Sequence, residues 1–454
     1  MDLTETTTIR LPAIELAWVD RLRRDPRLLA DMTEAVRGPF HVIYPTQFGV
    51  NLAAFRNVMA TAGVAGTVYF GKKANKSASW PRQCAEAYCG VDVASVPELV
   101  HSLAQGVRGK DLVVTGPAKN DELLRLAIRH GSLIAVDALD ELDRIIMLAK
   151  PRWLARILLR VLPAANPTSR FGLTEAESEH ALARCISESH NTRLEGFSFH
   201  LSGYDVAPRV WQASELIDRC IAARDMGLPA EAVSIGGGFA VNYLSEASWL
   251  EFNREYRDSW FHAQRTFREF YPYHQEPVGA DMLAAVLSGS VTSAHVDLAD
   301  KLAKTGTRLL IEPGRSLLDG CGFTVFPVLG FKNRSGYGIV TVARLSMSLS
   351  EQWFVSEYLP DPILWPDTGT SEPTSACVGG SSCLEVDMLT WRKIRFDRVP
   401  QVGDLLIYPN TAGYQMDSNE SEFHQLPLPP KIVISADQDG LRWLPEPGHL
   451  PREG

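Results

Sequence analysis

The chain has 454 residues, of which 45% are hydrophobic and 22% charged, a globular composition that excludes disordered, collagenous and disulfide-scaffold proteins. Because domains usually run to ~100–200 residues, this length predicts two or three of them. The formal net charge is -9 and no lysine- and arginine-rich block is present, so nucleic acid and anionic membranes are poor partners. We expect no membrane-spanning segment, since no run of ~18 uncharged apolar residues is present.

Residues 1–39 are predicted to form a peripheral helical segment, in which apolar residues mix with many arginines. We expect it to pack on a C-terminal β domain. The first residues, Met1–Glu5, are acidic and lack the apolar core of a secretory signal. Seven cysteines, an odd number without metal-like CxxC pairs, are most simply reduced thiols in the cytoplasm.

From residue 40 onwards, short β-type runs alternate with amphipathic stretches. Ser95–Gly106 illustrates the helices, because its apolar residues share one face and a glycine ends the pattern. This alternation indicates βαβ units with parallel strands. About eight units in residues 40–322 favour a (β/α)8 barrel over an open sheet. The predicted strands are Phe40–Tyr44, Thr67–Phe70, Gly90–Ala94, Asp111–Thr115, Ser132–Val136, Ala155–Leu162, Leu194–His200, Ala232–Ile235 and Thr307–Ile311.

Residues 323–454 are predicted to form an all-β domain of the sandwich or Greek-key type. The alternation with helices stops near Phe323, and no convincing long helix follows. The β-type runs here are Val325–Phe331, Tyr337–Leu345, Leu405–Tyr408 and Lys431–Ser435.

Two candidate motifs follow predicted strands at their C-terminal ends, where barrel enzymes gather their chemistry. Lys72 and Lys73 come first. A desolvated lysine can lose its proton and form a Schiff base, whereas an exposed lysine pair is the structural alternative. Gly236–Gly238 can wrap an anion such as phosphate with backbone N–H groups, or simply form a flexible turn. No GxGxxG or GxxxxGK[ST] pattern supports a nucleotide-binding fold.

Two further motifs carry ionisable side chains at strand ends. Glu312-Pro313-Gly314-Arg315 could pair a cation with Glu312 and an anion with Arg315, or could be a structural cap followed by a solvated arginine. His200 ends an alternating strand. A histidine there is usually structural, but its flat ring would also suit stacking on a planar cofactor.

The β domain contributes the last two candidates. Gly379–Asp387 places Cys383 among glycines, serines and acids, where a thiol is either reactive or a packing residue. Thr411–Tyr414 follows a predicted strand, and an aromatic turn is its structural alternative.

The order of these motifs resembles that of the fold-type III pyridoxal 5'-phosphate (PLP) enzymes, specifically the diaminopimelate/ornithine/arginine decarboxylases. The resemblance covers roughly residues 40–435. Further matching segments are Lys73–Asn75, Gly90–Ser95 with Glu98 and Leu99, Thr115–Lys119, Val136–Asp137, Ser169–Gly172 and Gly403–Leu406.

The resemblance implies roles for individual residues. Lys73 is similar to the lysine that holds PLP as an internal aldimine, and Asp92 to an acidic residue beside it. Arg160 matches an arginine near the cofactor, and His200 the imidazole that stacks on its ring. The residues implied in binding the phosphate are Ser202, Gly236, Gly237, Gly238, Gly314, Arg315 and Tyr414.

Two matches carry the expected mechanism. Glu312 resembles the carboxylate that pairs with the pyridine nitrogen and keeps the ring able to accept the electrons left when CO2 departs. The related alanine racemases have an arginine there, so Glu312 favours decarboxylation over racemisation. Cys383 matches the cysteine that protonates the quinonoid carbon. Because that cysteine reaches the PLP of the partner subunit, a homodimer with shared active sites is implied.

The substrate end departs from the family pattern. The usual His-Ile-Gly-Ser is His200–Gly203 here, which shifts the serine to Ser202. The acid that grips a distal ammonium after the catalytic cysteine is replaced by Leu384. Glu385, one residue later, would point to the other side of an extended segment. A bulge at Glu385, or the polar patch 417–422, is the alternative source of an acid.

We therefore expect a homodimeric, cytoplasmic PLP enzyme that decarboxylates an amino acid or an amino-acid-containing biosynthetic intermediate. Diaminopimelate, ornithine and lysine are disfavoured as substrates because Leu384 cannot pair with an ammonium. A racemase or other aldimine enzyme on the same scaffold is one alternative. A non-catalytic PLP-binding protein is another, although such barrels lack the β domain and its cysteine. No metal is expected.

Overall fold

The computed structural model describes residues 9–149, 153–291, 296–334, 336–349, 356–368, 372–417, 421–437 and 440–446. The chain divides into two compact units. The barrel unit consists of the described parts of residues 49–240 and 277–317, and the β unit consists of the described parts of residues 1–48, 241–276 and 318–454.

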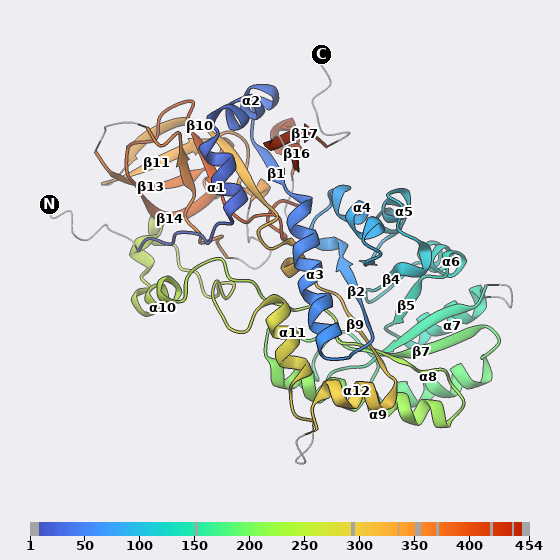
Figure 1. The fold of residues 1–454 in the computed structure, drawn as a ribbon. Coiled ribbons are helices and arrows are strands. Elements are labelled where there is room, and N and C mark those ends of the chain that lie inside the picture. Colours follow the sequence, from blue (N-terminus) through green and yellow to red (C-terminus); the bar gives the residue numbers. More distant parts are fainter. Residues whose placement is uncertain are drawn as a thin grey trace. The chain divides into compact units, whose positions relative to one another are not determined.

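The barrel unit contains a closed barrel of eight parallel strands in the order β2 to β9, which confirms the predicted architecture (Figure 1). The strands are β2 (Gly66–Gly71), β3 (Gly90–Val93), β4 (Leu112–Val114), β5 (Leu133–Val136), β6 (Ala155–Arg160), β7 (Thr192–Ser198), β8 (Ala232–Ser234) and β9 (Arg308–Ile311). The helices are α3 (Pro45–Thr61, which begins in the β unit), α4 (Ser79–Glu86), α5 (Val96–Ala104), α6 (Asp121–His130), α7 (Leu139–Leu148), α8 (Glu175–Ser187), α9 (Val206–Asp225), α11 (Gly279–Leu287) and α12 (Leu298–Thr305).

Local sequence signals set the helix ends. The side chain of Asn120 accepts a hydrogen bond from Leu123 N at the start of α6, and Gly131 ends that helix in the left-handed conformation. Ser95 caps α5 in the same way, as the pattern in Ser95–Gly106 predicts. Inside the barrel, apolar side chains from six strands form one buried cluster, consisting of Tyr69, Val113, Leu133, Leu158, Ala232 and Leu310.

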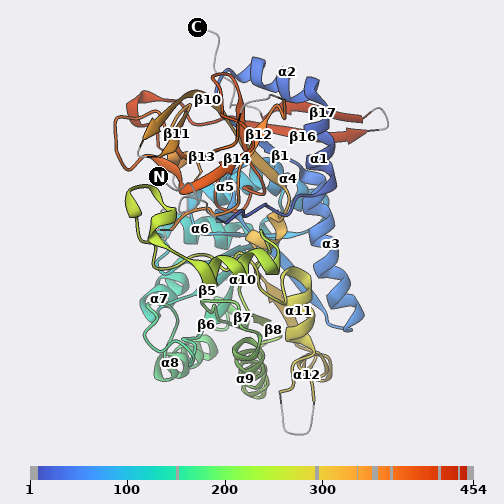
Figure 2. The same cartoon turned by 90° about the vertical axis from the view of Figure 1, so that its left-hand side faces the viewer.

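The β unit is built on a nine-stranded, mostly antiparallel sheet, as predicted for a separate β domain (Figure 2). Its main path runs β14-β13-β11-β10-β1-β16-β17, with β15 pairing β10 and β12. The strands are β1 (Phe40–Ile43), β10 (Gly322–Arg334), β11 (Tyr337–Val342), β12 (Ile363–Trp365), β13 (Thr374–Gly379), β14 (Met388–Phe396), β15 (Leu405–Tyr408), β16 (Lys431–Asp437) and β17 (Gly440–Pro445). The helices α1 (Ala17–Arg24) and α2 (Pro26–Val36) pack on this sheet through Trp18, Leu22, Leu29 and Met32.

Two expected boundaries are wrong. The run at Phe40 is a strand, but β1 pairs antiparallel with β10 and parallel with β16 and so belongs to the β unit. All four of its residues are buried, which gives it the continuous apolar pattern of a barrel strand. Residues 241–276, expected in the barrel, include α10 (Glu246–Glu255) and supply aromatic side chains such as Phe252 and Tyr273 to the core of the β unit.

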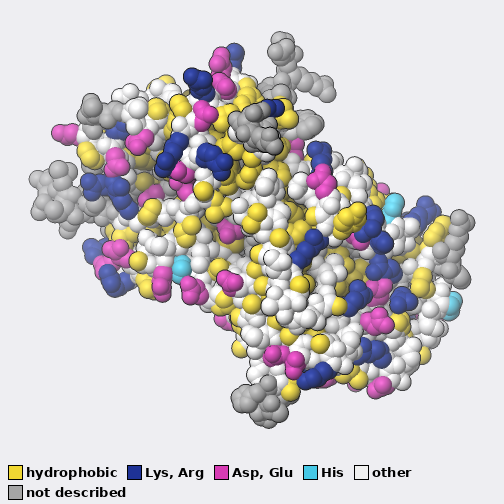
Figure 3. Space-filling view, viewed as in Figure 1, with side chains coloured by type: hydrophobic (Ala, Val, Ile, Leu, Met, Phe, Trp, Pro, Cys, Tyr) yellow, Lys and Arg dark blue, Asp and Glu magenta, His cyan; other side chains and the backbone are white. Residues whose placement is uncertain are grey.

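No helix in the described part of the chain is long and apolar enough to cross a membrane. On the face that Figure 3 shows, basic and acidic side chains are interspersed and do not gather by sign.

Candidate active site

The barrel unit has a cavity of about 310 Å³ at the carboxyl ends of its strands. Four residues predicted from the sequence line it, namely Lys73, Arg160, His200 and Glu312. The other lining residues are Ala94, Thr115, Gly116, Pro117, Ala135, Phe171, Ser198 and Phe199. Active sites of barrel enzymes lie at this end of the strands, so the location agrees with a catalytic role.

Lys73 lies one residue beyond Lys72, in the short helical turn that follows β2. Its Nζ is 3.2 Å from Oδ2 of Asp92, and about half of the Lys73 side chain is exposed. Asp92 is buried on β3 and accepts a second hydrogen bond, of 2.6 Å, from the hydroxyl of Thr115. This carboxylate therefore holds the Lys73 amine, whereas the amine of Lys72 donates to the carbonyl of Lys76.

Glu312 follows β9 and is held by Ser234, whose hydroxyl donates to Oε1 at 2.7 Å. Burial, and then the negative charge of Asp92, raise the pKa of Glu312 to about 7. Among the described residues no group donates to Oε2, which is available to hold a proton or to accept one from a ligand. The site thus contains a carboxyl group poised near neutral pH.

His200 lies two residues beyond β7, and its Nδ1 is 3.4 Å from the backbone nitrogen of Gly237, which donates to it. Desolvation, followed by the positive charges of Lys73 and Arg160, lowers the pKa of His200 to about 3. The side chain is nevertheless exposed to solvent at one side, and the direction of the shift favours a neutral ring at pH 7. The backbone donor requires an unprotonated Nδ1, which agrees with a neutral imidazole.

Gly236–Gly238 form the loop after β8, called here the glycine loop. A Cβ on Gly236 would lie 2.5 Å from Nδ1 of His200, and one on Gly237 would lie 2.7 Å from the carbonyl oxygen of Glu312. Real Cβ atoms do not approach other atoms this closely, so the loop packs against both predicted site residues because it has no side chains. Glycine is therefore needed here for close packing.

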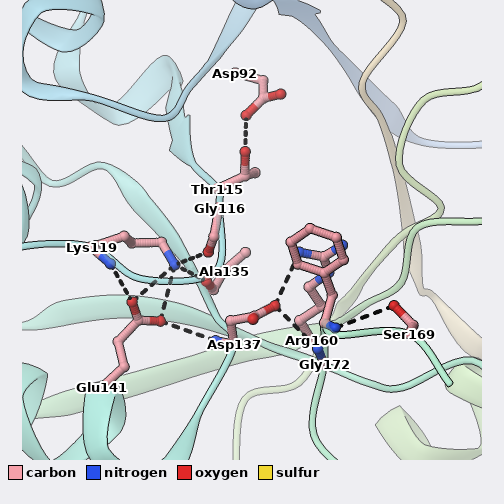
Figure 4. A network of polar contacts seen from close by, with 11 residues as sticks. Asp92, Thr115, Gly116, Lys119, Ala135, Asp137, Glu141, Arg160, Ser169 and Gly172 are labelled. Carbon is pink, nitrogen blue, oxygen red and sulfur yellow. Dashed lines mark hydrogen bonds and ion pairs between the residues drawn. The ribbon is translucent and has the colours of Figure 1, made fainter. Parts of the chain in front are cut away.

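Arg160 is the centre of a polar network at the end of β6 (Figure 4). Its Nη1 donates to Oδ1 of Asp137 at 3.0 Å, and its guanidinium lies over the ring of Phe171, 4.5 Å from the centroid. Asp137 Oδ1 also accepts from Gly172 N at 3.2 Å. The network fixes the segment 169–172, which the family resemblance singled out.

A buried ion pair supports the neighbouring strand ends (Figure 4). Lys119 Nζ lies 3.0 Å from Oε2 of Glu141, and both side chains are almost fully buried. The same amine donates to the carbonyls of Gly116 and Ala135, which line the cavity. Lys119 thus holds two parts of the cavity wall in place.

Two residues predicted to bind the phosphate, Ser202 and Arg315, are not among the residues that line the cavity. Ser202 is exposed in the turn between β7 and α9, and it does not line the cavity. Arg315 begins a short helical turn, Arg315–Leu318, immediately after Gly314. The carbonyl of Pro313 accepts a hydrogen bond from Gly71 N at 3.1 Å, which ties this turn to the end of β2.

The remaining candidates belong to the β unit. Cys383, Leu384 and Glu385 are all exposed in the loop between β13 and β14, and Cys383 Sγ is 3.5 Å from Nε2 of His424. Asp387 anchors this loop by accepting from the backbone nitrogens of Ser346 (2.7 Å) and Ser382 (3.1 Å).

Tyr414 and the polar patch after it also lie in the β unit. Tyr414 is partly buried and has a left-handed backbone, with φ of +75°. Asp417 is buried and forms a 2.6 Å ion pair with Lys431. Residues 418–420 lie outside the described residues, and Glu422 is exposed.

Sequence reasoning missed several residues of the site. The hydroxyl of Ser198 is buried, lines the cavity and has no hydrogen-bond partner within the described part of the chain. Ser234, which holds Glu312, and Arg209, which is buried beside the glycine loop, were also missed. Ser198 and Ser234 are each the last residue of a barrel strand, a position from which a role in the site could have been predicted. Arg209 lies within a helix, where no pattern in the sequence indicates such a role.

The sequence of residues 51–319, more than half of the chain, matches the family described as pyridoxal-dependent decarboxylase, pyridoxal binding domain. The chain belongs to this family. It is an enzyme of the fold-type III PLP-dependent decarboxylases, and its cofactor is PLP. The family, the cofactor and the enzyme class predicted from the sequence are confirmed.

Similar proteins cover nearly the whole chain. The uncharacterized protein y4yA of Sinorhizobium fredii is 35% identical over 434 residues, 94% of each chain. The 2-[(L-alanin-3-ylcarbamoyl)methyl]-2-hydroxybutanedioate decarboxylase of Staphylococcus aureus is 22% identical over 82% of this chain and 88% of its own. The structure of diaminopimelate decarboxylase from Methanocaldococcus jannaschii in co-complex with L-lysine matches with a TM-score of 0.71 and 20% identity, covering 92% of this chain and 91% of that one, and shows a shared fold.

The residues around the cavity fit PLP. An amine for the aldehyde, a carboxyl for a ring nitrogen and a flat neutral imidazole all line it, and they are contributed by Lys73, Glu312 and His200. The glycine loop lies beside them, where backbone N–H groups suit a phosphate. The hydroxyl of Ser198, which has no hydrogen-bond partner among the described residues, offers a further polar contact in the cavity wall.

Proposed function

We propose that this chain decarboxylates an amino acid, or a biosynthetic intermediate that contains one, with PLP bound covalently to Lys73. The observation that carries the proposal is the convergence of Lys73, His200 and Glu312 on one cavity at the carboxyl ends of the barrel strands. Each comes from a different strand, so the closed barrel brings together groups that are far apart in sequence.

PLP, when bound, supplies a ring that accepts the electron pair left by departing CO2. Glu312 is the group that would hold a proton on the ring nitrogen, since its Oε2 is available while Ser234 fixes Oε1. An arginine at this position would repel that proton, so the carboxyl group supports decarboxylation over racemisation. Asp92 would orient the Lys73 amine and stabilise its positive charge when it is protonated.

His200 would bind the cofactor through its ring face. The lowered pKa favours a neutral ring, and Nδ1 accepts a hydrogen bond from the backbone nitrogen of Gly237. Because this bond fixes its orientation, the ring presents a flat face to the cofactor. The glycine loop, Arg315 and Tyr414 would hold the phosphate. Ser202 is the weakest candidate for this role because it is exposed and lies away from the cavity lining.

We propose that Cys383 donates the proton that replaces CO2, in a cavity shared with the partner subunit of a homodimer. The support is the exposure of the loop that carries it. Leu384 and Val386 are half-exposed apolar side chains on either side of an exposed Glu385, and Cys383 precedes them. Exposed apolar side chains beside a reactive group are expected at a subunit interface.

The distal end of the substrate is proposed to be neutral or anionic. Leu384 stands where a diamino-acid decarboxylase needs an acid, and Asp417 is already paired with Lys431. A buried ammonium without a carboxylate partner costs several kcal/mol, which would exclude a basic diamino acid. The name of the Staphylococcus aureus relative describes an alanine conjugated to a hydroxybutanedioate, which is a carboxylate-bearing substrate of this kind.

A CO2-release screen tests the proposal. We expect turnover with glutamate-like, citrulline-like or larger conjugated amino acids, and little with diaminopimelate, ornithine or lysine. Leu384→Asp should gain activity on the basic substrates, while Val386→Asp, which adds the same charge to another exposed residue of the loop, should not. Efficient turnover of a basic diamino acid by the unmodified enzyme would refute the specificity, and absence of CO2 from every class tested would refute the decarboxylation.

A further inference from the structure

A buried guanidinium lies beside the glycine loop. Arg209 is in the first turn of α9, and only 1% of the residue is exposed. Its Nη2 donates to the carbonyls of Gly203 at 2.8 Å and Gly237 at 3.5 Å, and its Nη1 donates to the carbonyl of Asp205 at 2.9 Å. One side chain thus ties the turn that follows His200 to the loop that follows β8.

None of the described residues forms an ion pair that would balance the charge on this side chain. Within the described part of the chain, no carboxylate lies within salt-bridge distance of Arg209, and its buried Nε has no hydrogen-bond partner. Burial lowers the pKa of Arg209 from its ordinary value, and the smaller electrostatic influences of Tyr204 and of the exposed Asp205 oppose this shift. Buried charges in proteins are normally paired, so an unpaired one indicates a missing anion.

Other arginines of this chain follow the usual rule. Arg156, in the same barrel unit, pairs with both carboxylate oxygens of Glu195, at 2.6 and 3.1 Å. Arg392, fully buried in the β unit, pairs with Asp361. Arg209 differs from both because, among the described residues, its guanidinium donates to backbone carbonyls alone.

The glycine loop is shaped around Arg209. A Cβ on Gly238 would lie 2.2 Å from Nη2 of Arg209, and Gly238 has a left-handed backbone with φ of +78°. The third glycine is therefore required by the arginine as well as by the backbone conformation. The loop that is expected to bind a phosphate is in direct contact with the unpaired cation.

We propose that Arg209 is a positioning residue for the cofactor phosphate, fixing the glycine loop and supplying a buried positive charge that the phosphate dianion neutralises. In the family a serine helps to hold the cofactor phosphate. Because the corresponding Ser202 is exposed in this chain, Arg209 would serve that purpose instead. The inference rests on the proposed function, in which PLP occupies the barrel cavity.

The test compares PLP with pyridoxal, which lacks the phosphate. Dissociation constants of both would be measured on the cofactor-free protein by absorbance and fluorescence titration, with no activity readout. Arg209→Gln should weaken PLP binding by about 10-fold or more and leave pyridoxal binding within a factor of ~2, because only PLP carries the charge that the arginine serves. Equal weakening of both ligands, or no change in either, would overturn the inference.

Arg156→Gln is the matched control, since it removes a partly buried arginine that is already paired with Glu195, at the opposite end of a barrel strand. It should lower the melting temperature without changing the ratio of the two dissociation constants. If Arg209→Gln does not fold, the two dissociation constants are measured on Arg209→Lys instead. A lysine keeps the charge but cannot hold both loops, so the ratio should still rise by about 3-fold or more, and an unchanged ratio would contradict the proposal. If unmodified protein binds neither ligand, the proposed function itself fails.

Discussion

At the residue scale, Glu312 combines two demands that oppose each other. The proposed catalysis needs a carboxyl group at the ring nitrogen, and the fold needs buried groups to be neutral or paired. With the negative charge of Asp92 close by, burial raises the pKa of Glu312 to about 7 in the protein without cofactor. A protonated ring nitrogen would supply the missing positive partner, so an ionised Glu312 would be more favourable in the enzyme with bound cofactor than in the cofactor-free protein.

Replacing Glu312 by glutamine should separate binding from catalysis. Glutamine retains the size of the side chain and can accept from Ser234, so Glu312→Gln should still bind PLP, as judged by its absorbance. It cannot keep the ring nitrogen charged, and kcat measured by CO2 release should fall by ~10²-fold or more. A variant with near-normal turnover would falsify the role given to this carboxyl group.

The same substitution should change stability with pH in the cofactor-free protein. In the unfolded chain Glu312 titrates near ~4.3, and in the folded one near 7, so the unmodified protein loses stability as pH rises between these values. Glutamine has no such loss. Glu312→Gln should therefore be more stable than the unmodified protein by on the order of 4 kcal/mol at pH 8, with the difference vanishing towards pH 4. Urea unfolding at both pH values measures this, and a difference independent of pH would contradict the assigned pKa.

At the element scale, the site depends on how closely the loops after β7, β8 and β9 approach one another. Gly237→Ala tests this packing, because the added Cβ would meet the carbonyl oxygen of Glu312 at 2.7 Å. We expect PLP affinity to fall by about 10-fold or more, as the loop must move away from Glu312 and His200.

Gly49→Ala is the control for this change. Gly49 lies in α3, and an added Cβ there meets nothing within 4 Å. Alanine should leave PLP affinity unchanged and raise stability slightly, since it favours helix more than glycine does. Equal PLP affinity in the two variants would show that the loop has room to spare and that close packing is unimportant.

The sequence predicted the structure correctly where the residue pattern of a single strand or helix is sufficient to identify it. The eight barrel strands are short β-type runs between amphipathic helices, and the catalytic candidates at their ends converge as the topology requires. It failed for β1, because a strand buried on both faces has the same pattern in either unit. It also failed for Arg209, whose importance comes from a three-dimensional contact with Gly237 and Gly238 that no local pattern encodes.

At the scale of the whole molecule, the proposed catalytic groups are divided between two units. Lys73 lies in the barrel unit and Cys383 in the β unit, and a homodimer would combine the lysine of one chain with the cysteine of its partner. Lys73→Ala and Cys383→Ala should each be inactive or nearly so. Mixing them should restore activity, approaching about a quarter of the unmodified level per site if subunits exchange at random, because one hybrid site then holds both groups. No recovery, with exchange confirmed by mass spectrometry, would exclude a shared site.

The most direct test of the central claim is to find which residue holds the cofactor. Borohydride treatment of the purified holoenzyme followed by peptide mapping should place the pyridoxyl group on Lys73, whose amine lies in the cavity beside Asp92. Lys72 is the internal control, since it is the adjacent lysine and its amine donates to the carbonyl of Lys76. Label on Lys73, and its loss in Lys73→Ala, is the predicted result. Label on Lys72 or another lysine, or no label after PLP is added, would contradict the site described here.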